Sequence, residues 1–303
     1  MRYGFIGLGH LGGHLATSLV RHGFALTVHD RNRGAAEPLI AKGAAWAETP
    51  RALAASCDAV ITCLPSPAVS ETVLTGPDGI LAGLKRGGTW IEMSTLGRDE
   101  VQRLAKLAEA QGISVLESPV TGGVHRAAEG EITVLVGGDK ALFTHHRPAL
   151  EAMGGEIFHM GPLGSAAVIK VITNMLAFIH LVAAGEALML AKKGGLELAQ
   201  AFHAIRASSG NSFVHETESQ LILNGSYDID FTMDLACKDL GFAMGLSRDF
   251  GVPLELARRT AEIFQQGRAA YGGGAQSTQI VKLLEDTLGT DLRAPGFPAR
   301  LTD

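Results

Sequence analysis

The chain has 303 residues, of which 46% are hydrophobic and 19% charged, and its formal net charge at pH 7 is −5. This length suits two domains, and the composition is typical of a globular protein with a sizeable core rather than of a disordered chain. The weakly acidic balance, without a long basic run, argues against a nucleic-acid-binding protein.

The cysteines and the apolar runs indicate the cellular compartment of the protein. Three widely spaced cysteines, Cys57, Cys63 and Cys237, form no CxxC pair, so we expect a reducing compartment and a cytoplasmic protein. The amino-terminal apolar run is too short for a secretory signal. No 18 consecutive residues are all apolar, so we expect no membrane partner. The eleven histidines show no ligand spacing such as HExxH, so no metal site is predicted.

Short apolar runs alternate with helical patterns in the first half of the chain. The first helical pattern extends from about His10 to His22 and stops at Gly23. Strands that alternate with helices predict a parallel sheet covered on both faces, as in a Rossmann-type α/β domain. The predicted strands are residues 3–6, 25–29, 59–64, 89–93, 113–117 and 132–136.

One long apolar pattern opens the second half and extends over residues 165–193. It contains no proline and ends in two lysines followed by Gly194 and Gly195, which are helix-stop signals. A helix of this length spans about 40 Å. Because it is apolar nearly all round, we expect it to be buried, partly against a second subunit.

Helical patterns dominate after this segment, and few strand signals remain. The sequence therefore predicts three regions. These are a dinucleotide-binding Rossmann-type domain (residues 1–163), an all-α substrate and dimerisation domain built around the long helix (164–290), and a tail (291–303).

A glycine-rich turn, GxGxxG, lies between the first predicted strand and the first predicted helix. It consists of Gly7, Leu8, Gly9, His10, Leu11 and Gly12. The first glycine permits the tight turn, the second lets the backbone approach a pyrophosphate, and the third lets helix and strand pack closely. The helix amino terminus then offers N–H groups and a positive dipole end to phosphates, so the motif predicts a dinucleotide site.

Asp30 ends the second predicted strand, about 20 residues after the glycine turn. A carboxylate there accepts hydrogen bonds from ribose hydroxyls and repels a 2′-phosphate, which favours NAD. Arg31 and Arg33 follow at once, and arginines at this corner can hold a 2′-phosphate. We therefore predict NAD as the cofactor, with NADP as the alternative.

A second candidate site follows the strand predicted at residues 113–117. Ser118 and Pro119 lead into Thr121, Gly122 and Gly123, a turn whose backbone N–H groups can surround an anion, with a hydroxyl beside them. A substrate carboxylate suits such a turn. The alternative is a connecting loop without a ligand.

Lys170 lies inside the long apolar helix, and Asn174 follows one turn later on the same face. Burial lowers the pKa of a lysine towards neutrality, where the amine both donates and accepts protons. The alternative is a lysine that extends to the surface near the helix start. Lys238, in a Lys-Asp-Leu run, is a further candidate, and its alternative is a surface ion pair.

Taken in order, six motifs resemble the β-hydroxyacid dehydrogenase family, which includes 3-hydroxyisobutyrate dehydrogenase and tartronate semialdehyde reductase. The resemblance reaches to about Leu288. The motifs are GFIGLGHLG, CLPSPAV, IEMST, SPVTGGVHRAAEG, GPLGSAAVIKVITN and KDLGFAM.

This resemblance implies a role for each candidate. Leu64 and Pro65 would flank the riboses of the cofactor, with Thr95 near its nicotinamide. The TGG turn would hold the substrate carboxylate, and Lys170 would be the catalytic lysine with Asn174 as its orienting neighbour. Lys238 would contact the cofactor or the substrate.

The chain also departs from the family pattern. Glu92 and Glu117 stand where aspartates are usual, Thr121 replaces a serine, and Ala166 replaces a glycine before the catalytic lysine. Arg126 and its neighbour His125, directly after the TGG turn, are suited to bind a second anionic group. These differences affect the identity of the substrate more than the reaction.

The resemblance thus implies an NAD(P)-dependent enzyme that interconverts a small β-hydroxy acid and its semialdehyde, and that forms a homodimer or homotetramer. An imine reductase is the nearest alternative, but such enzymes typically lack a lysine at the position of Lys170. A non-catalytic dinucleotide-binding module would be expected to have lost either this lysine or the TGG turn. A phosphogluconate dehydrogenase would be longer and would carry a histidine before Asn174.

Overall fold

A computed structural model describes residues 1–301 of the chain. It divides into two compact units, one ending at Lys170 and the other beginning at Val171. The division falls inside the long helix, a few residues after the boundary at 163 that the sequence pattern suggests.

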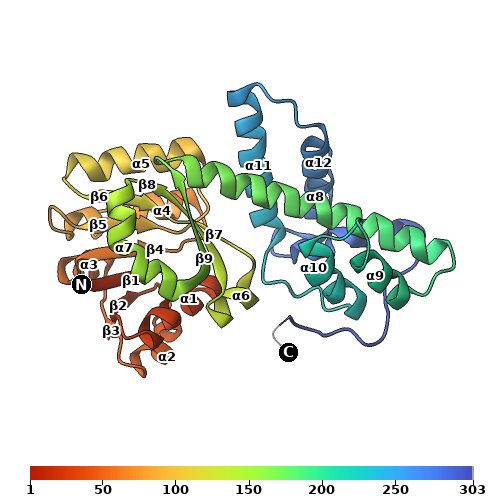
Figure 1. Cartoon of the computed structure of the whole chain (residues 1–303), viewed down its shortest axis with the longest axis horizontal. Coiled ribbons are helices and arrows are strands. Elements are labelled where there is room, and N and C mark those ends of the chain that lie inside the picture. Colours follow the sequence, from red (N-terminus) through yellow and green to blue (C-terminus); the bar gives the residue numbers. More distant parts are fainter. Residues whose placement is uncertain (302–303) are drawn as a thin grey trace. The chain divides into compact units, whose positions relative to one another are not determined.

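The first unit is built on a nine-stranded sheet (Figure 1). Its strands are β1 (Arg2–Ile6), β2 (Ala25–His29), β3 (Ala45–Trp46), β4 (Ala59–Thr62), β5 (Thr89–Glu92), β6 (Ser114–Glu117), β7 (Val120–Thr121), β8 (Ile132–Gly138) and β9 (Gly154–Gly161). The order is β3-β2-β1-β4-β5-β6-β8-β7, with β9 also paired to β8. The chain order reverses between β1 and β4, and a ligand of such a sheet binds at this switch point, beyond the carboxyl ends of the strands.

Six of these strands lie where the sequence predicts them, and the Rossmann-type fold class is confirmed. The strands from β3 to β6 are all parallel, whereas β8 runs antiparallel to β6 and β7. The sequence analysis did not predict β3, β7 or β9. Strand β9 starts with Gly154 and Gly155 directly after a helix, and glycine weakens any strand signal.

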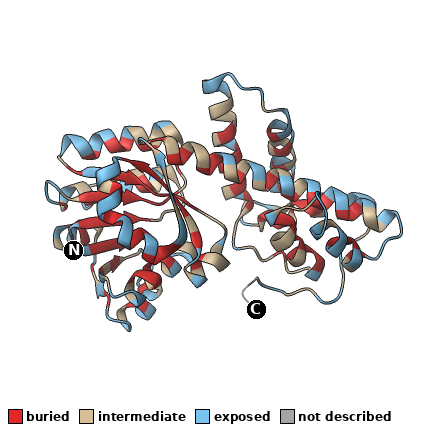
Figure 2. Cartoon of the chain, in the orientation of Figure 1, coloured by how far each residue is buried: buried red, intermediate tan, exposed pale blue. Residues whose placement is uncertain are grey.

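Two hydrophobic cores cover the two faces of the sheet, because successive residues of a strand point to opposite sides. Phe5 belongs to one core and Ile6 to the other, and the sheet is largely buried (Figure 2). The helices of this unit are α1 (His10–Arg21), α2 (Glu37–Ile40), α3 (Pro50–Ser56), α4 (Pro67–Thr75), α5 (Arg98–Ala110), α6 (Val124–Glu129) and α7 (Lys140–Met153), with 3₁₀ turns η1 (Arg33–Ala36) and η2 (Ile80–Ala82). Helices α1 and α7 pack in the first core, α3 and α5 in the second.

The second unit is helical. Its core includes Leu188, Phe202, Leu240 and Phe264. Its elements are α8 (Ser165–Lys193), which begins in the first unit, α9 (Leu198–Arg206), α10 (Phe213–Asn224), α11 (Met233–Phe250), α12 (Glu255–Tyr271), η3 (Ser277–Val281) and α13 (Lys282–Leu288). Helix α8 has the predicted limits, and the all-α character of this region is confirmed.

By length and composition alone, α8 is apolar enough to cross a bilayer, since an 18-residue window of it reaches a mean hydropathy of 1.9. The same test is passed by the core helix of a water-soluble protein, and 39% of that window is buried in the chain. The helix is therefore weak evidence for a membrane.

The segment after α13, expected as a tail, is packed against the helical unit. The side chain of Leu292 is fully buried, and the N–H of Ala294 donates to the carbonyl of Leu223 at 3.0 Å. The Phe297 ring contacts that of Phe202 edge-on, with centroids 4.9 Å apart. These contacts tie the segment to α9 and α10.

Candidate active site

The glycine turn after β1 lies against the end of β4. Gly7 has φ +97°, and a Cβ on it would lie 2.2 Å from the carbonyl oxygen of Cys63. A Cβ on Gly12 would lie 2.0 Å from the Gly7 carbonyl oxygen, so helix α1 packs against the turn too closely for any side chain. A Cβ on Gly9 would meet nothing within 4 Å, which leaves open space over the amino terminus of α1.

This turn has the properties of a phosphate cradle. Gly9 is the N-cap of α1 and supplies no side chain to cap the first turn, which comprises His10, Leu11 and Gly12. The positive end of the helix dipole therefore faces an open space that an anion can enter. The residues present fit the pyrophosphate of a dinucleotide.

Asp30 is fixed beside this cradle. Its Oδ2 accepts the N–H of Leu8 at 2.7 Å and its Oδ1 accepts that of Asn32 at 2.8 Å. Each carboxylate oxygen keeps a further lone pair for a ribose hydroxyl. Arg31 is exposed next to it.

Arg33, the other arginine at this corner, has several contacts of its own. It lies 3.3 Å from the Glu48 carboxylate and 3.9 Å from that of Glu37, and its guanidinium lies over the Trp46 ring at 5.5 Å. Both ion pairs are exposed, so each contributes little to stability. Together, these contacts hold the guanidinium beside Glu48 and over the Trp46 ring.

The loop after β4, which contains Leu64 and Pro65, is fastened to the end of β5. The N–H of Leu64 donates to Ser94 Oγ at 2.8 Å, and the N–H of Ser94 donates to Glu92 Oε1 at 2.7 Å. Glu92 is buried, and this burial raises its pKa against the opposing effect of hydrogen bonds from Ser94 and other hydroxyls. Thr95 directly follows this network.

The TGG turn adopts a backbone that glycine alone accepts readily, with φ +120° at Gly122 and +90° at Gly123. Thr121 ends β7 and is half-buried. A Cβ on Gly122 would lie 3.1 Å from Arg126 Cδ, and one on Gly123 would lie 2.9 Å from His125 Cε1. The basic side chains of α6 therefore fold back over the turn.

Lys170 is buried, with 8% of its surface exposed, and it lies near the end of β4. The pKa of the Cys63 thiol is raised to about 12, chiefly by burial and also by the charge of Glu92, while the charge of Lys170 lowers it. The structure thus brings Lys170 near Cys63, whose carbonyl adjoins Gly7 of the glycine cradle. It does not place Lys170 at the surface, as the alternative interpretation required.

Asn174 and Lys238, in the helical unit, are joined by Asp239, to which the sequence analysis assigned no role. Asp239 is 1% exposed; its Oδ2 accepts Asn174 Nδ2 at 2.7 Å, and its Oδ1 lies 3.0 Å from Lys238 Nζ. The Asn174 amide is thereby held in one orientation. The sequence shows an aspartate directly after the candidate Lys238. It does not show the hydrogen bond between this aspartate and Asn174 on α8, because the two residues are 65 positions apart.

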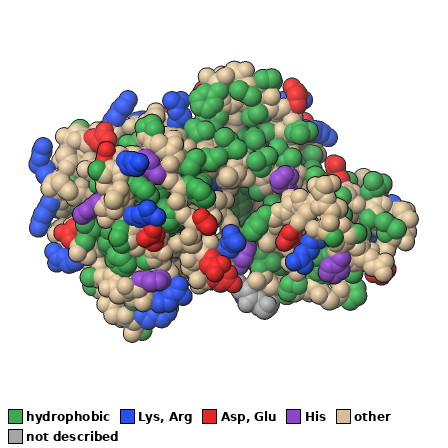
Figure 3. Space-filling view, viewed as in Figure 1, with side chains coloured by type: hydrophobic (Ala, Val, Ile, Leu, Met, Phe, Trp, Pro, Cys, Tyr) green, Lys and Arg blue, Asp and Glu red, His purple; other side chains and the backbone are tan. Residues whose placement is uncertain are grey.

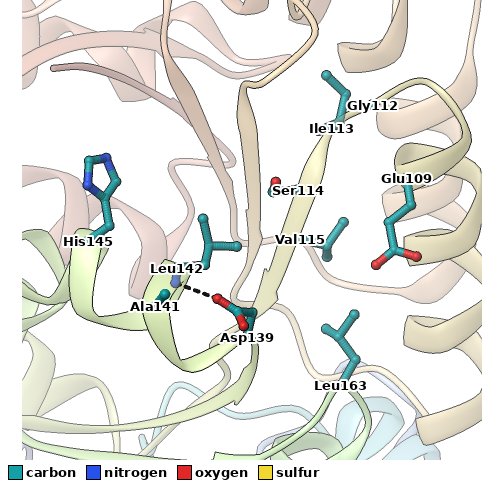
Figure 4. A pocket seen from close by; sticks show the side chains of 10 residues that line it. All are labelled: Glu109, Gly112, Ile113, Ser114, Val115, Asp139, Ala141, Leu142, His145 and Leu163. Carbon is teal, nitrogen blue, oxygen red and sulfur yellow. Dashed lines mark hydrogen bonds between the residues drawn. The ribbon is translucent and has the colours of Figure 1, made fainter.

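A cavity of about 610 Å³ lies elsewhere in the first unit, at the amino end of β6 (Figure 4). Its walls include Glu109, Ser114, Asp139 and His145, and Asp139 already accepts the N–H of Leu142 at 2.8 Å. None of the predicted site residues lines it. Among residues 1–301, no group of three His, Cys, Asp or Glu side chains is arranged to hold a metal ion.

Comparison with known proteins decides the family. Residues 2–161 match the NAD-binding domain of 6-phosphogluconate dehydrogenase, and residues 164–284 match the NAD-binding domain of NADP-dependent 3-hydroxyisobutyrate dehydrogenase. The chain belongs to the NAD(P)-dependent hydroxyacid dehydrogenases. It is therefore an NAD(P)-dependent oxidoreductase that acts on hydroxyl groups, as predicted.

Several relatives cover most of this dehydrogenase. A 2-(hydroxymethyl)glutarate dehydrogenase from Eubacterium barkeri is 32% identical over 96% of the chain and 97% of its own length. An NAD-dependent L-serine dehydrogenase from Pseudomonas aeruginosa is 35% identical over 79% of the chain and 83% of its own length. The structure of Mycobacterium tuberculosis 3-hydroxyisobutyrate dehydrogenase with L-serine has a TM-score of 0.83 and 30% identity; the match covers 94% of this chain and 99% of that one.

Proposed function

We propose that this dehydrogenase interconverts a small β-hydroxy acid and its semialdehyde, with Lys170 as the general acid and base. The observation that carries the proposal is the burial of this lysine near Cys63, whose carbonyl adjoins the glycine cradle. A buried amine is suited to change its protonation state near neutral pH.

Different residues of the chain transfer the proton, orient the reacting oxygen and bind the substrate carboxylate. In the oxidising direction, neutral Lys170 Nζ takes the proton of the substrate hydroxyl; in the reducing direction, its ammonium returns it. The bound nicotinamide supplies the hydride acceptor or donor. Asn174, held by Asp239, orients the reacting oxygen. The N–H groups and the hydroxyl of Thr121–Gly123 bind the substrate carboxylate.

We propose NAD as the preferred cofactor. Asp30 presents a carboxylate at the ribose corner, while Arg33 is directed towards Glu48 and Trp46. The measurement is kcat/KM for both cofactors with one substrate, and a higher value with NADP would contradict this preference. Asp30→Ser should raise the NADP to NAD ratio, because a 2′-phosphate is no longer repelled.

The substrate class is tested by absorbance at 340 nm with a panel of hydroxy acids and both cofactors. The panel includes 3-hydroxyisobutyrate, glycerate, L-serine, L-threonate and 2-(hydroxymethyl)glutarate, the last three being substrates named for relatives. We expect saturable oxidation of at least one. The absence of turnover with all five, despite measurable NADH binding, would contradict the proposed class.

The role of Lys170 is tested by substitution. Lys170→Ala should lower kcat by about 10² to 10⁴, the usual contribution of a general acid or base. NADH affinity, measured by fluorescence titration, should change little. Lys170→Arg should not restore activity, since a guanidinium does not release its proton near neutral pH. Retention of more than about a tenth of wild-type kcat in Lys170→Ala would exclude the acid–base role.

A further inference from the structure

Glu117 makes an unusual set of contacts at the start of α8. Its side chain is 1% exposed, and its carboxylate accepts three backbone N–H groups from residues 47 to 50 positions further along the chain. Oε1 accepts from Gly164 at 2.6 Å and from Ala166 at 2.9 Å; Oε2 accepts from Ala167 at 3.0 Å.

These donors are the N–H groups that the first turn of a helix leaves without an intrahelical acceptor. A serine, threonine or aspartate at the N-cap usually satisfies them, but Gly164 precedes α8 and has no side chain to do so. The carboxylate of Glu117, at the end of β6, takes over that role. It fixes the start of α8 to the central sheet.

Lys170 follows one turn after these residues. It is four positions beyond Ala166 and three beyond Ala167, so it lies on the same side of the helix as the capped residues. A shift or rotation of the helix start would therefore move the lysine. Burial raises the pKa of the Glu117 carboxyl, whereas the three backbone N–H donors lower it and so favour its ionised form. The ionised carboxylate places a negative charge at the start of the helix that carries Lys170.

Gly137 is the second component of this arrangement. It faces Glu117 across the antiparallel pair of β6 and β8. A Cβ on Gly137 would lie 2.1 Å from Glu117 Oε1 and 2.9 Å from its Cδ and Cγ. A methyl group there would therefore push the carboxylate out of its place. The backbone of Gly137 has no positive φ, so the glycine is required by this contact and not by its conformation.

We propose that Glu117 is a positioning residue for the reaction, which sets the place and the electrostatic surroundings of Lys170 through the start of α8, and that Gly137 provides the space it needs. This inference rests on the proposed function of Lys170. It differs from a purely structural role because it predicts effects on turnover and on the pH profile that loss of stability alone does not produce.

Three variants separate position from charge. Glu117→Asp keeps the charge but shortens the side chain, Gly137→Ala displaces an intact carboxylate, and Glu117→Gln removes the charge. The matched control is Gly155→Ala on neighbouring β9, where the nearest atom to the new Cβ is at 3.4 Å, an ordinary contact. All four are compared with the wild type in kcat, KM, NADH affinity, and amide hydrogen exchange of residues 164–170.

We expect the three test variants to exchange faster at residues 164–170 and to lose about 10- to 100-fold in kcat, since a displacement of about 1 Å costs that much. NADH affinity should stay within about threefold. In Glu117→Gln, the midpoint of the rising limb of kcat/KM against pH, measured for oxidation, should move to lower pH by about 0.5 unit, whereas in Glu117→Asp it should not move. Gly155→Ala should behave as the wild type.

Unchanged exchange at residues 164–170 in Glu117→Gln and Gly137→Ala would overturn the contact itself. Faster exchange with kcat within about threefold of wild type would overturn the positioning role. The second outcome requires a wild-type enzyme that oxidises a hydroxy acid. A wild type inactive with every hydroxy acid would instead refute the proposed function, while the exchange measurement would still test the contact.

Discussion

Arg126 is the residue that we expect to determine which substrate is preferred. Its side chain lies on Gly122. Burial lowers the pKa of the adjacent His125; the charge of Glu129 opposes this effect and that of Arg126 adds to it. Near neutral pH, the guanidinium is therefore the cation at this turn. We expect it to bind a second anionic group of a hydroxy dicarboxylate, as in the substrate named for the Eubacterium barkeri relative.

Arg126→Ala should lower kcat/KM for 2-(hydroxymethyl)glutarate by about 10- to 100-fold, the effect of losing a hydrogen bond to a charged group. The value for L-serine or 3-hydroxyisobutyrate should fall much less. Arg147→Ala removes an exposed arginine that pairs with Glu151 on α7 and serves as the control. An equal loss for every substrate would show that Arg126 does not select between them.

Asp239 holds both Asn174 and Lys238. Asp239→Ala removes the acceptor of the Asn174 amide and the carboxylate beside Lys238 in a buried place. We expect kcat/KM to fall about 10- to 100-fold and the free energy of unfolding to fall by about 1 to 3 kcal/mol. Enzyme kinetics and urea unfolding measure the two effects. Asp249→Ala, at an exposed site on the same helix, should change neither; full activity of Asp239→Ala would refute the orienting role.

Helix α7 is joined to the sheet by a buried histidine. His146 Nδ1 lies 3.0 Å from Tyr3 Oη, and its Nε2 lies 3.0 Å from Thr89 Oγ1. Burial, and to a smaller extent the charge of His145, lower the pKa of His146 from 6.5 to about 4. The unfolded chain therefore binds a proton at a higher pH than the folded chain does.

It follows that His146 lowers stability as the pH falls from about 6.5 to about 4, by at most about 1.4 kcal/mol per pH unit. The unfolding free energy of the wild type, relative to that of His146→Leu, should decrease across this window and be level above it. Urea unfolding at several pH values measures the difference, and His22→Gln, at an exposed site, is the control. A difference that does not vary with pH would show that His146 does not titrate in this way.

The elements also show what the sequence can predict and why. Six strands and α8 were predicted because their signals are local: apolar runs, an absence of proline, and stop signals such as Gly194. The antiparallel insertion of β8 next to β6 was not predicted, since a strand's direction depends on pairing between distant segments.

The same distinction applies to the candidate site. The glycine turn, the TGG turn and Lys170 belong to short motifs, so their candidacy was visible in the sequence. The roles of the supporting carboxylates were not visible in the sequence. Glu117 accepts hydrogen bonds from residues 47 to 50 positions away, and Asp239 accepts one from Asn174, 65 positions away. Contacts at such separations leave no periodic pattern in the sequence.

Several large apolar side chains remain at the surface of the folded chain. In the space-filling view they gather over α11 and α12, and the exposed residues of that region are Phe250, Val252 and Leu256 (Figure 3). On α8, Ile172 and Leu176 are 37% and 43% exposed. They are four residues apart, so they share one face of a helix that the sequence analysis expected to pack partly against a second subunit.

We expect the protein to associate with itself through this face of α8, because burying exposed Leu and Ile side chains stabilises an interface by about 25 cal/mol per Å² of apolar surface. Light scattering after size-exclusion chromatography should give a mass of at least twice 31.8 kDa. Leu176→Asp places a charge in the face and should shift the mass towards that of one chain. Leu107→Asp, at a similarly exposed position on α5, should leave the mass unchanged. A wild-type protein that elutes as one chain at micromolar concentration would rule out this association, and an unaltered mass in Leu176→Asp would place the interface elsewhere.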